Sequence, residues 1–235
     1  MAQPFSRLNH PGTLISWTMP DDHLATQAST RAEALRASPA LFEAKTLDRL
    51  TRVHPAVVPL IFGPAIVVFA VRAFYDMSVL KSILGILGGY GIWTLSEYWI
   101  HRVVFHFEPD HRLGARLHFI VHGVHHDHPN DPMRLVMPPA VSVPLGTLFW
   151  LFFAVVFELP FAWAIAAGFF AGYLFYDMLH FALHHAHAKN RVAKRLRELH
   201  MRHHFEDEEC GFAVSAPWWD MVFGTYSPKA RRQRP

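Results

Sequence analysis

The stretch LPFAWAIAAGFFAGYLFYDMLHFALHH, residues 159–185, joins a long apolar run to a group of histidines. Its first 18 residues, 159–176, contain no charged side chain and no histidine. Because a helix needs roughly 17–25 apolar residues to cross a bilayer, this run is long enough to span one. His180, His184 and His185 follow at once. The stretch therefore predicts a transmembrane helix that ends in the residue type that most often binds metals in proteins.

Three further apolar runs have similar lengths, at residues 55–71, 79–100 and 140–157. The alternative is a soluble protein with buried core helices, but four such runs exceed what the core of a 235-residue chain needs. Only a few residues join the first run to the second and the third to the last, which predicts two helical hairpins. We therefore expect an all-α fold, with four transmembrane helices and a histidine-rich helical cap that holds a di-metal site.

The polar segments carry nearly all the basic residues and every histidine. After four crossings, the N-terminal segment, the loop at 101–139 and the tail at 177–235 lie on one side of the membrane. They contain 6, 4 and 10 Lys or Arg residues, whereas the hairpin tips contain only Arg72 and Lys81. The positive-inside rule thus predicts a multi-pass membrane protein whose termini and active site face the cytosol. The membrane would be the cytoplasmic membrane of a bacterium or the endoplasmic reticulum of a eukaryote.

The composition also favours a membrane. Hydrophobic residues make up 51% of the chain and charged residues 17%, against roughly 25% charged in a typical soluble domain. The net charge is +3, but the basic residues form no nucleic-acid recognition motif, so membrane lipid is their expected partner. A single cysteine, Cys210, excludes an intrachain disulfide and a cysteine-rich metal site.

We divide the chain into three parts. Residues 1–37 form a polar N-terminal segment that we expect to be partly disordered, residues 38–226 form the membrane-embedded domain, and residues 227–235 form a basic C-terminal tail. A short helix is predicted over residues 39–52, with Ser38 as its N-cap and Pro39 at its first helical position.

Eighteen histidines are the outlier of the composition, and most of them fall into four clusters. Residues three and four apart share a helix face, so HGVHH (122–126) and HMRHH (200–204) should each bring their histidines to one spot. The five-residue gap between His101 and His106 does not stay on one regular helix face. It indicates a helix end or a pair that reaches two different metals. A zinc site uses three or four ligands, so ten histidines suit two ions with about five nitrogens each: His101, His106, His122, His125, His126, His180, His184, His200, His203 and His204.

Two carboxylates lie one helical turn before histidines of these clusters. Glu97 precedes His101 by four residues, and Asp177 precedes His180 by three. Each carboxylate can accept the outer N–H of its imidazole and thereby fix the tautomer of the ring. The alternative for Glu97 is a residue at the membrane boundary that only faces water.

His118 and His185 lie beside the clusters and are additional candidate ligands.

The ligand residues do not determine which metal binds. Imidazole binds iron, copper, nickel and zinc. Two redox-active irons can split dioxygen and attack an unactivated C–H bond, whereas two zinc ions would support hydrolysis. Zinc competes well for nitrogen ligands, so it can occupy in a structure a site where iron works.

The order of the motifs EYWIHRVVFH, HGVHHDHP, YDMLHFALHH and LHMRHHFEDEECGFAVSAPWWDMVFGTY resembles the fatty acid hydroxylase/sterol desaturase superfamily. The stretches SPALFEAKTLDRLTRVHPAVVPLIFGP and GFAVSAPWWDMVFGTY resemble its fatty acid 2-hydroxylase branch, and the likeness extends from about Ser38 to Tyr226. It implies a membrane-bound, non-haem di-iron monooxygenase that uses O2 to hydroxylate a long acyl chain next to its carbonyl. The ten histidines named above are the ligands it implies.

The resemblance also implies partners. Such enzymes receive electrons relayed from a reductase, and eukaryotic members often carry an N-terminal haem domain. Only 37 residues precede Ser38, too few for that domain, so a separate electron donor of the cytochrome or ferredoxin type is expected. The acyl chain can belong to a free fatty acid or to a sphingolipid.

A long acyl chain is expected to enter from the bilayer, because each CH₂ exposed to water costs about 0.8 kcal/mol. We predict a slot between the membrane helices and the cap. Its wall residues would be Trp93, Tyr98, Phe175 and Tyr176. The alternative for these aromatic residues is an interfacial belt without substrate contact.

Rival functions remain open. They are a histidine-rich zinc-binding membrane protein (transporter or buffer), a zinc hydrolase, a scaffold without chemistry, and a sterol or carotenoid hydroxylase or desaturase of the same superfamily. A transporter normally places ionisable residues inside its membrane helices, and three of the four apolar runs contain none. A hydrolase would need a free carboxylate as general base and fewer ligands.

Overall fold

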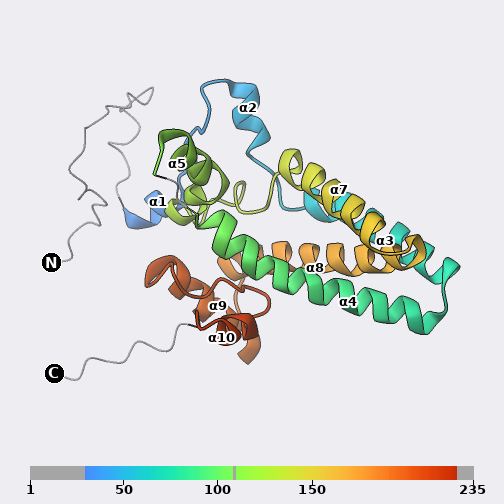
Figure 1. Ribbon diagram of the computed structural model, residues 1–235. Coiled ribbons are helices and arrows are strands. Elements are labelled where there is room, and N and C mark those ends of the chain that lie inside the picture. The colour runs from blue at the N-terminus through green and yellow to red at the C-terminus, as the bar shows by residue number, and fades with distance from the viewer. Residues whose placement is uncertain (1–29, 108–109, 227–235) are drawn as a thin grey trace.

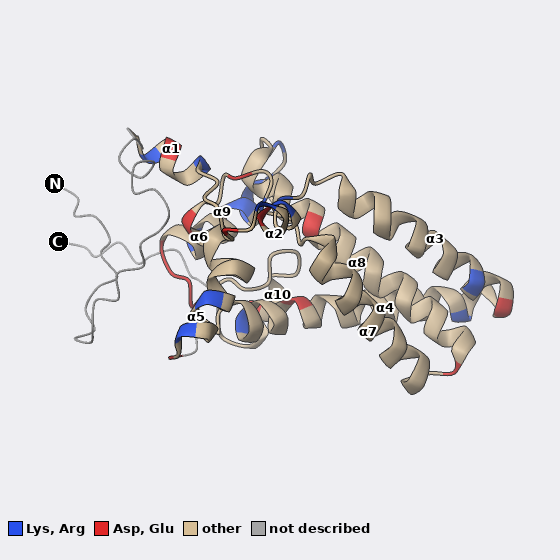
Figure 2. Cartoon of the chain, turned by 90° about the horizontal axis from the view of Figure 1, so that it is seen from above, with Lys and Arg blue, Asp and Glu red and all other residues tan. Residues whose placement is uncertain are grey.

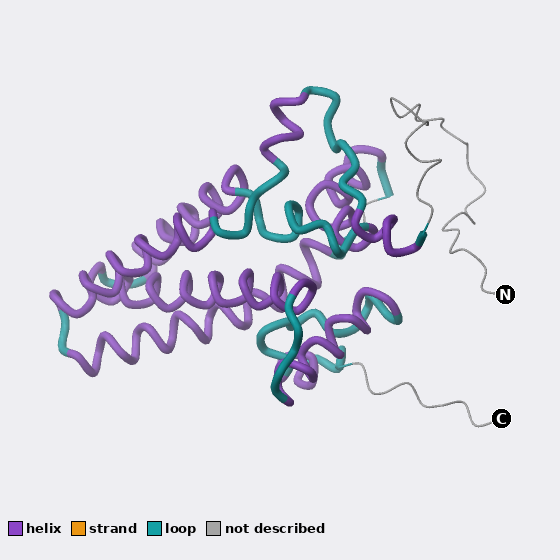
Figure 3. Tube along the Cα trace, turned by 180° about the vertical axis from the view of Figure 1, so that it is seen from behind, coloured by secondary structure: helices purple, strands orange, loops and turns teal. Residues whose placement is uncertain are grey.

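The structure, a computed structural model, describes residues 30–107 and 110–226 (Figure 1). All regular structure within these two ranges is helical, as Figure 3 shows by colour. The expectation of an all-α fold is therefore confirmed. Residues 1–29 of the predicted polar segment and the predicted tail at 227–235 lie outside the described residues.

Four helices are long and apolar enough to cross a membrane. They are α3 (Val57–Asp76), α4 (Val79–Trp99), α7 (Pro139–Val156) and α8 (Leu159–His185). They form a bundle that extends away from the rest of the chain, and the α3–α4 and α7–α8 turns lie at the same far end (Figures 1 and 3). The predicted four helices in two hairpins are confirmed, and the protein is a membrane protein.

Helix α8 is the centre of this bundle. In the most apolar 18-residue stretch of α8, 61% is buried within the structure, against 11% to 28% in the corresponding stretches of the other three helices. It packs against α3, α4 and α7, whose other faces expose leucine, valine and phenylalanine side chains. Lipid is the environment that suits such faces.

Helices α4 and α8 approach each other closely because small residues line their contact. A Cβ added at Gly89 would lie 2.0 Å from the carbonyl oxygen of Ile165, and one added at Gly168 would lie 1.9 Å from that of Ile86. Such contacts between small residues are typical of helices packed in membranes. The close approach fixes the histidine-bearing ends of α4 and α8 relative to each other.

The other helices form a cap at the opposite end of the bundle (Figure 1). They are α1 (Arg31–Arg36), α2 (Lys45–Leu50), η2 (Ile100–Phe105), α5 (Arg112–His118), η3 (Phe119–Gly123), α6 (Val124–Asp127), α9 (Arg191–Phe205) and α10 (Trp218–Val222). Both η2 and η3 are π-helices; η2 continues α4, and η3 joins α5 to α6. Figure 2, which colours the positions of charged residues, shows that they gather on this cap.

The start of the cap differs from the helix predicted at residues 39–52. Helix α2 covers only Lys45–Leu50, and its N-cap is Ala44. The hydroxyl of Ser38, the predicted N-cap, donates instead to Asp131 at 2.5 Å, and Arg52 donates to the Ser38 carbonyl at 2.9 Å. The prediction was wrong because a hydrogen bond to a distant loop competes with local capping.

Residues 30–37 are the described part of the predicted polar segment. They contain α1, which begins with a capping box. Its last turn is tied to the loop before α7: the Leu35 carbonyl accepts from the Asn130 N–H at 3.0 Å, and the Ala34 carbonyl accepts from His128 Nδ1 at 2.7 Å. Two tertiary hydrogen bonds therefore join this polar stretch to the loop before α7.

Candidate metal centres

The ten predicted histidines meet in two groups of five where the cap joins the bundle. In each group, one ligand nitrogen of every residue lies within 4.8 Å of those of the others. Centre A contains His101, His106, His122, His126 and His203. Centre B contains His125, His180, His184, His200 and His204. This is the arrangement of two five-nitrogen sites that the sequence predicted, and the role of the residues as metal ligands stays a prediction.

The spacing of the inward nitrogens suits metal ions. In centre B, His200 Nε2 lies 2.7 Å from His184 Nε2 and 3.1 Å from His204 Nε2. In centre A, four pairs of Nε2 atoms lie 3.0 to 3.3 Å apart. An ion about 2.1 Å from each nitrogen holds adjacent ligands about 3.0 Å apart. The distances between the nitrogens match those of ligands that share an ion.

Hydrogen bonds among the imidazoles cannot satisfy all the inward nitrogens. A neutral imidazole offers one N–H and one lone pair, so five rings aimed at one point leave some atoms unpaired. The Nε2 atoms of His125 and His180 are buried and have no hydrogen-bond partner among the described residues. A buried unpaired polar atom costs about 1–3 kcal/mol. Binding of an ion removes this cost in centre B, to which both histidines belong. For centre A, the Nε2 distances given above fit a metal.

Burial also keeps the cap histidines in the neutral form that binds metals. It lowers the pKa of His122, His125, His200 and His204 well below the ordinary value, and neighbouring imidazoles lower it further. For His203, burial lowers the pKa to about 4. These rings can therefore offer lone pairs to an ion at neutral pH.

A π-helix explains the five-residue gap between His101 and His106. In the π-helix η2, the His106 N–H donates to the His101 carbonyl at 3.1 Å. Because a π-helix bonds residue i to residue i+5, two side chains five apart lie one turn apart on the same face. Both histidines therefore belong to centre A, and the idea that they reach two different metals is wrong.

The two HxxHH motifs divide their histidines between the centres. In HGVHH (122–126) the first and last histidines face centre A, and His125 faces centre B. In HMRHH (200–204) the first and last face centre B, and His203 faces centre A. The expectation that each motif converges on one spot was wrong. Positions i+3 and i+4 differ by about 100° around a helix, which is enough to aim them at different ions.

Two histidines of centre A are held by the segment that follows α9. His101 Nδ1 donates to the Phe212 carbonyl at 2.6 Å, and His203 Nδ1 donates to the Cys210 carbonyl at 2.7 Å. Each bond fixes the proton on Nδ1 and leaves the Nε2 lone pair directed at the centre. Sequence reasoning missed this support, because a backbone carbonyl leaves no mark in the pattern of residue types.

Glu97 does not support His101 as expected. Its carboxylate accepts from the Ser215 N–H at 2.7 Å and from the Ser215 hydroxyl. The Phe212 carbonyl takes the outer nitrogen of His101 instead. The expected contact is wrong because the C-terminal segment folds back over the end of α4 and supplies closer partners. Glu97 is only 2% exposed, so the alternative of a water-facing residue is also wrong.

Asp177 likewise turns away from its predicted partner. Its carboxylate lies beside the Tyr173 hydroxyl and the Met137 backbone amide. Nowhere in the described chain does it form a hydrogen bond with His180; one of its oxygens and His180 Nε2 both lack a partner. The three-residue spacing puts both side chains on one face of α8 but does not aim the carboxylate at the ring.

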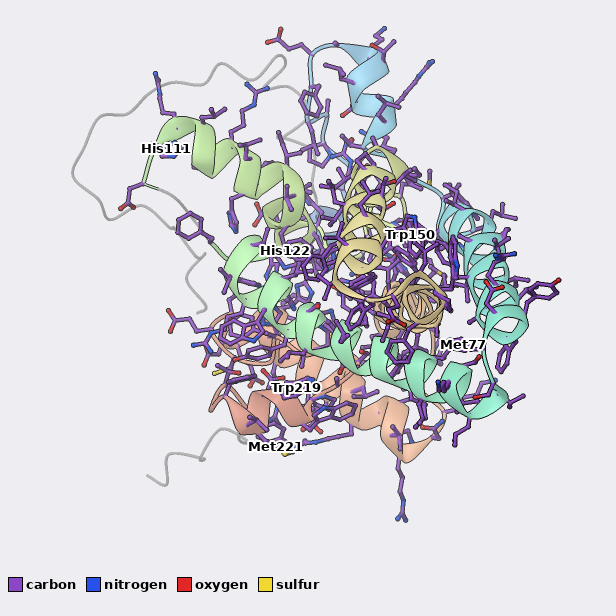
Figure 4. All side chains as sticks on the ribbon, turned by 45° about the vertical axis from the view of Figure 1, so that its right-hand side comes forward. Met77, His111, His122, Trp150, Trp219 and Met221 are labelled. Carbon is purple, nitrogen blue, oxygen red and sulfur yellow. The ribbon has the colours of Figure 1, made fainter. Side chains whose placement is uncertain are left out.

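The additional candidates His118 and His185 belong to neither group of five. His185 is exposed at the end of α8, and His118 is half-buried at the end of α5. Figure 4 shows His122 in the interior, and His111 at the outer end of the helix that leads to it. His111 caps that helix by accepting from the Gly114 N–H at 3.0 Å.

An apolar cavity leads from the centres into the bundle. Ile100 and Phe105 line its end near the cap, and Phe149 and Phe169 line its end inside the bundle. The Phe105 ring stacks on His122 with 5.1 Å between the ring centroids. The cavity therefore begins at the edge of centre A, and the four membrane helices supply most of its lining residues.

Two of the four predicted wall residues line this cavity. They are Trp93 and Tyr176, with ring centroids 5.8 Å apart. Tyr98 is buried elsewhere, bonded to the Thr225 hydroxyl at 3.1 Å, and Phe175 is 48% exposed. The prediction is wrong for these two as wall residues, because each lies on another face of its helix than the cavity-lining residues. Substrate contact stays a prediction for Trp93 and Tyr176.

Comparison with known proteins identifies the family. Residues 86–225 match the model of the fatty acid hydroxylase family, which is more than half of the chain and includes both centres. The chain belongs to the fatty acid hydroxylase family. Proteins of this family are oxidoreductases, and the resemblance seen in the motifs is confirmed.

Similar members come from plants, yeast and animals. A dihydroceramide fatty acyl 2-hydroxylase of Arabidopsis thaliana is 36% identical over 193 residues, which cover 82% of this chain and 81% of that protein. The ceramide very long chain fatty acid hydroxylase of Saccharomyces cerevisiae is 40% identical over 77% of this chain and 47% of its own length. Human fatty acid 2-hydroxylase is 32% identical over 80% of this chain and 57% of its own length. This chain thus spans about half the length of the yeast and human proteins that it matches.

A solved structure has the same fold. It is full-length Scs7p, of which only the hydroxylase domain is visible. The TM-score is 0.76 at 36% sequence identity, over 80% of this chain and 72% of that chain. The arrangement of membrane helices and cap is therefore that of a fatty acid hydroxylase.

Proposed function

We propose that this protein is a membrane-bound, non-haem di-iron monooxygenase that uses O2 to hydroxylate carbon 2 of long acyl chains, in a free fatty acid or a sphingolipid. The observation that carries the proposal is the position of two five-imidazole centres at one end of an apolar cavity within the membrane bundle. The hydroxylase domain is then residues 38–226. The names of the relatives, which are acyl and ceramide hydroxylases, support the substrate class.

Centres A and B would each hold one iron through neutral imidazole nitrogens. When bound, the two irons supply the activation of O2 and the attack on an unactivated C–H bond. His125 and His203 each come from a motif whose other histidines serve the opposite centre. Because each of these two histidines faces the centre opposite to its motif, they keep the two centres adjacent. A reaction that uses both irons requires such an arrangement.

The cavity would hold the alkyl chain and exclude water from it. Each CH₂ kept from water contributes about 0.8 kcal/mol, so the apolar end between Phe149 and Phe169 suits the tail. The carbons next to the carbonyl then lie at the opposite end, beside Ile100 and Phe105. Because Phe105 stacks on His122, that end is the part of the cavity nearest centre A.

A separate electron donor would complete the reaction. Reducing O2 to one hydroxyl group and one water requires two electrons from outside the substrate. We expect a donor protein of the cytochrome or ferredoxin type with its reductase, acting on the cap. The Lys and Arg bias supports a cap that faces the cytosol, where such a donor can reach it.

Lipid profiling of cells with and without the protein tests the proposal. A rise in 2-hydroxylated acyl chains is expected. His184→Ala should abolish the product because His184 lies in centre B, whereas His185→Ala, which alters the adjacent exposed histidine, should retain it. Hydroxylated or desaturated sterol or carotenoid, or metal uptake with no lipid product, would contradict the proposal and favour the corresponding rival.

A further inference from the structure

One buried carboxylate ties down the segment that follows α9. Asp220, in α10, is only 2% exposed. Its Oδ1 accepts from the Phe212 N–H at 2.9 Å and from the Thr225 hydroxyl at 2.8 Å, and its Oδ2 accepts from the Ala213 N–H at 3.0 Å. Three donors on one carboxylate give the turn at residues 211–213 a fixed position.

The same turn is anchored from its other side. The Gly211 N–H donates to the Thr225 carbonyl at 2.8 Å, and the Thr225 hydroxyl bonds Tyr98 of α4. Gly211 has φ of 76°, a conformation that favours glycine. Trp219, labelled in Figure 4, donates to Thr94 Oγ1 at 3.1 Å and holds α10 against α4.

The peptide groups of this turn point from Asp220 toward centre A. The peptide between Phe212 and Ala213 donates its N–H to Asp220 and accepts the His101 Nδ1–H on its carbonyl. The Cys210 carbonyl, two residues earlier in the chain, accepts from His203. A peptide whose N–H is bonded to a carboxylate is a more polarised acceptor. The Phe212–Ala213 peptide thus links the Asp220 carboxylate to His101, and the same turn supplies the acceptor for His203.

Centre B has no such link. The Nδ1 atoms of His184, His200 and His204 are buried and have no hydrogen-bond partner within residues 30–107 and 110–226. The two centres have equal numbers of imidazoles, but their outer surroundings differ.

We propose that Asp220 is a positioning residue for centre A, acting through the Phe212–Ala213 peptide to orient His101 and, through the same turn, His203. It would make the ion of centre A dependent on the C-terminal segment, whereas the ion of centre B is held by its imidazoles alone. This rests on the proposed metal binding. If the unaltered protein does not hold two ions per chain, that result would count against the proposed function rather than against the role of Asp220.

The test is the release of iron from the purified full-length protein. In Asp220→Asn, an amide NH₂ faces a backbone N–H, so at least one bond to the turn is lost. Loss of a residue that supports a ligand typically weakens metal binding by about 10- to 100-fold. We expect release of one of the two ions to a chelator to become about tenfold faster, with release of the other unchanged. Thr225→Val, a milder change, should shift the same ion in the same direction.

Three comparisons make the result specific. Asp48→Asn removes a carboxylate of the cap that bonds Leu41 and Arg52 and should leave both release rates unchanged. In a His203→Ala background, in which centre A is already impaired, Asp220→Asn should change the rate of ion release little. In a His184→Ala background, in which centre B is impaired, Asp220→Asn should lead to release of both ions. Unchanged release in Asp220→Asn, or equal acceleration for both ions, would overturn the role, since equal acceleration is what a general loss of structure produces.

Discussion

At the scale of single residues, Trp93 is one of the residues that line the cavity. It is 6% exposed, and its ring packs edge-on against Phe169 and Tyr173 at 5.2 and 5.3 Å. We predict that Trp93→Leu shifts the hydroxylated products toward other chain lengths, because the smaller side chain enlarges the middle of the cavity. Metal content should not change, because Trp93 contributes no ligand to either centre.

Phe175→Leu is the matched control for this experiment. Phe175 is 48% exposed and does not line the cavity, so its product profile should equal that of the unaltered protein. The measurement is mass spectrometry of 2-hydroxylated acyl chains from cells that express each variant. If Trp93→Leu gives an unchanged profile, Trp93 is a packing residue and does not contact substrate.

The identity of the metal is also decided at the residue level. Five imidazoles bind zinc as readily as iron, so occupancy does not reveal the working ion. We predict that metal-free protein reconstituted with iron turns over and that zinc-loaded protein does not, because zinc has no redox chemistry. The assay is turnover with an added electron donor. Equal turnover with both metals would exclude the proposed oxidation.

Spacing in the sequence identified the ten histidines but not their division between the centres. Helix periodicity states which residues share a face, and that is enough to select candidates. His125 and His203 lie within one turn of their neighbours, yet each faces the other centre. The direction of a side chain within a turn depends on how α6 and α9 cross, which no local pattern records. The same limit explains why Glu97, correctly expected close to the site, bonds Ser215 rather than His101.

At the scale of helices, the α4–α8 contact tolerates no added side chain at Gly168. A Cβ there would lie 1.9 Å from the Ile86 carbonyl oxygen. We predict that Gly168→Ala lowers the thermal unfolding midpoint in detergent, because overpacking typically costs about 1–3 kcal/mol. Separation of the two helices should also lower metal content, since α4 continues into the helix of His101 and α8 carries His180.

Gly91→Ala is the control for this substitution. Gly91 is on α4, the helix that Gly168 of α8 contacts, and nothing lies within 4 Å of the position of its added Cβ. Alanine is favoured over glycine in a helix by about 0.8–1.0 kcal/mol, so this variant should unfold at the same temperature or higher. Equal midpoints for the two variants would show that the helices can move apart without loss.

Hydropathy predicted the four membrane helices but not where they end. The apolar run of α8 stops near Tyr176, yet the helix continues to His185, and α4 continues as a π-helix to Phe105. Both extensions contain charged residues or histidines, which interrupt the apolar run, so an unbroken apolar stretch does not mark them. Helix α2 was misplaced for a related reason: Ser38 bonds Asp131, 93 residues away, and leaves the capping role that its local sequence suggested.

At the scale of the whole molecule, the chain consists of two similar halves. Each has a membrane hairpin, a pair of histidines at the end of the second helix, and an HxxHH motif. Each half gives four imidazoles to one centre and one to the other. Neither centre is complete without both halves, so metal binding couples the two hairpins. A ligand that binds only the folded state stabilises it, which makes the ions part of the fold as well as of the chemistry.

This arrangement requires both hairpins to present their histidines on one side of the membrane, and the basic residues predict that it is the cytosolic side. A Cys210→Ala background allows single cysteines to report the orientation, because Cys210 is the only cysteine and contributes only its carbonyl to His203. Tyr75, at the hairpin end of α3, is 82% exposed, and Val192, on α9, is 68% exposed. We predict that Val192→Cys reacts with an impermeant maleimide added to the cytosolic face of sealed membranes, and that Tyr75→Cys reacts only from the opposite face. The reverse pattern would mean that the cap faces away from the cytosol, where a cytosolic electron donor could not reach it.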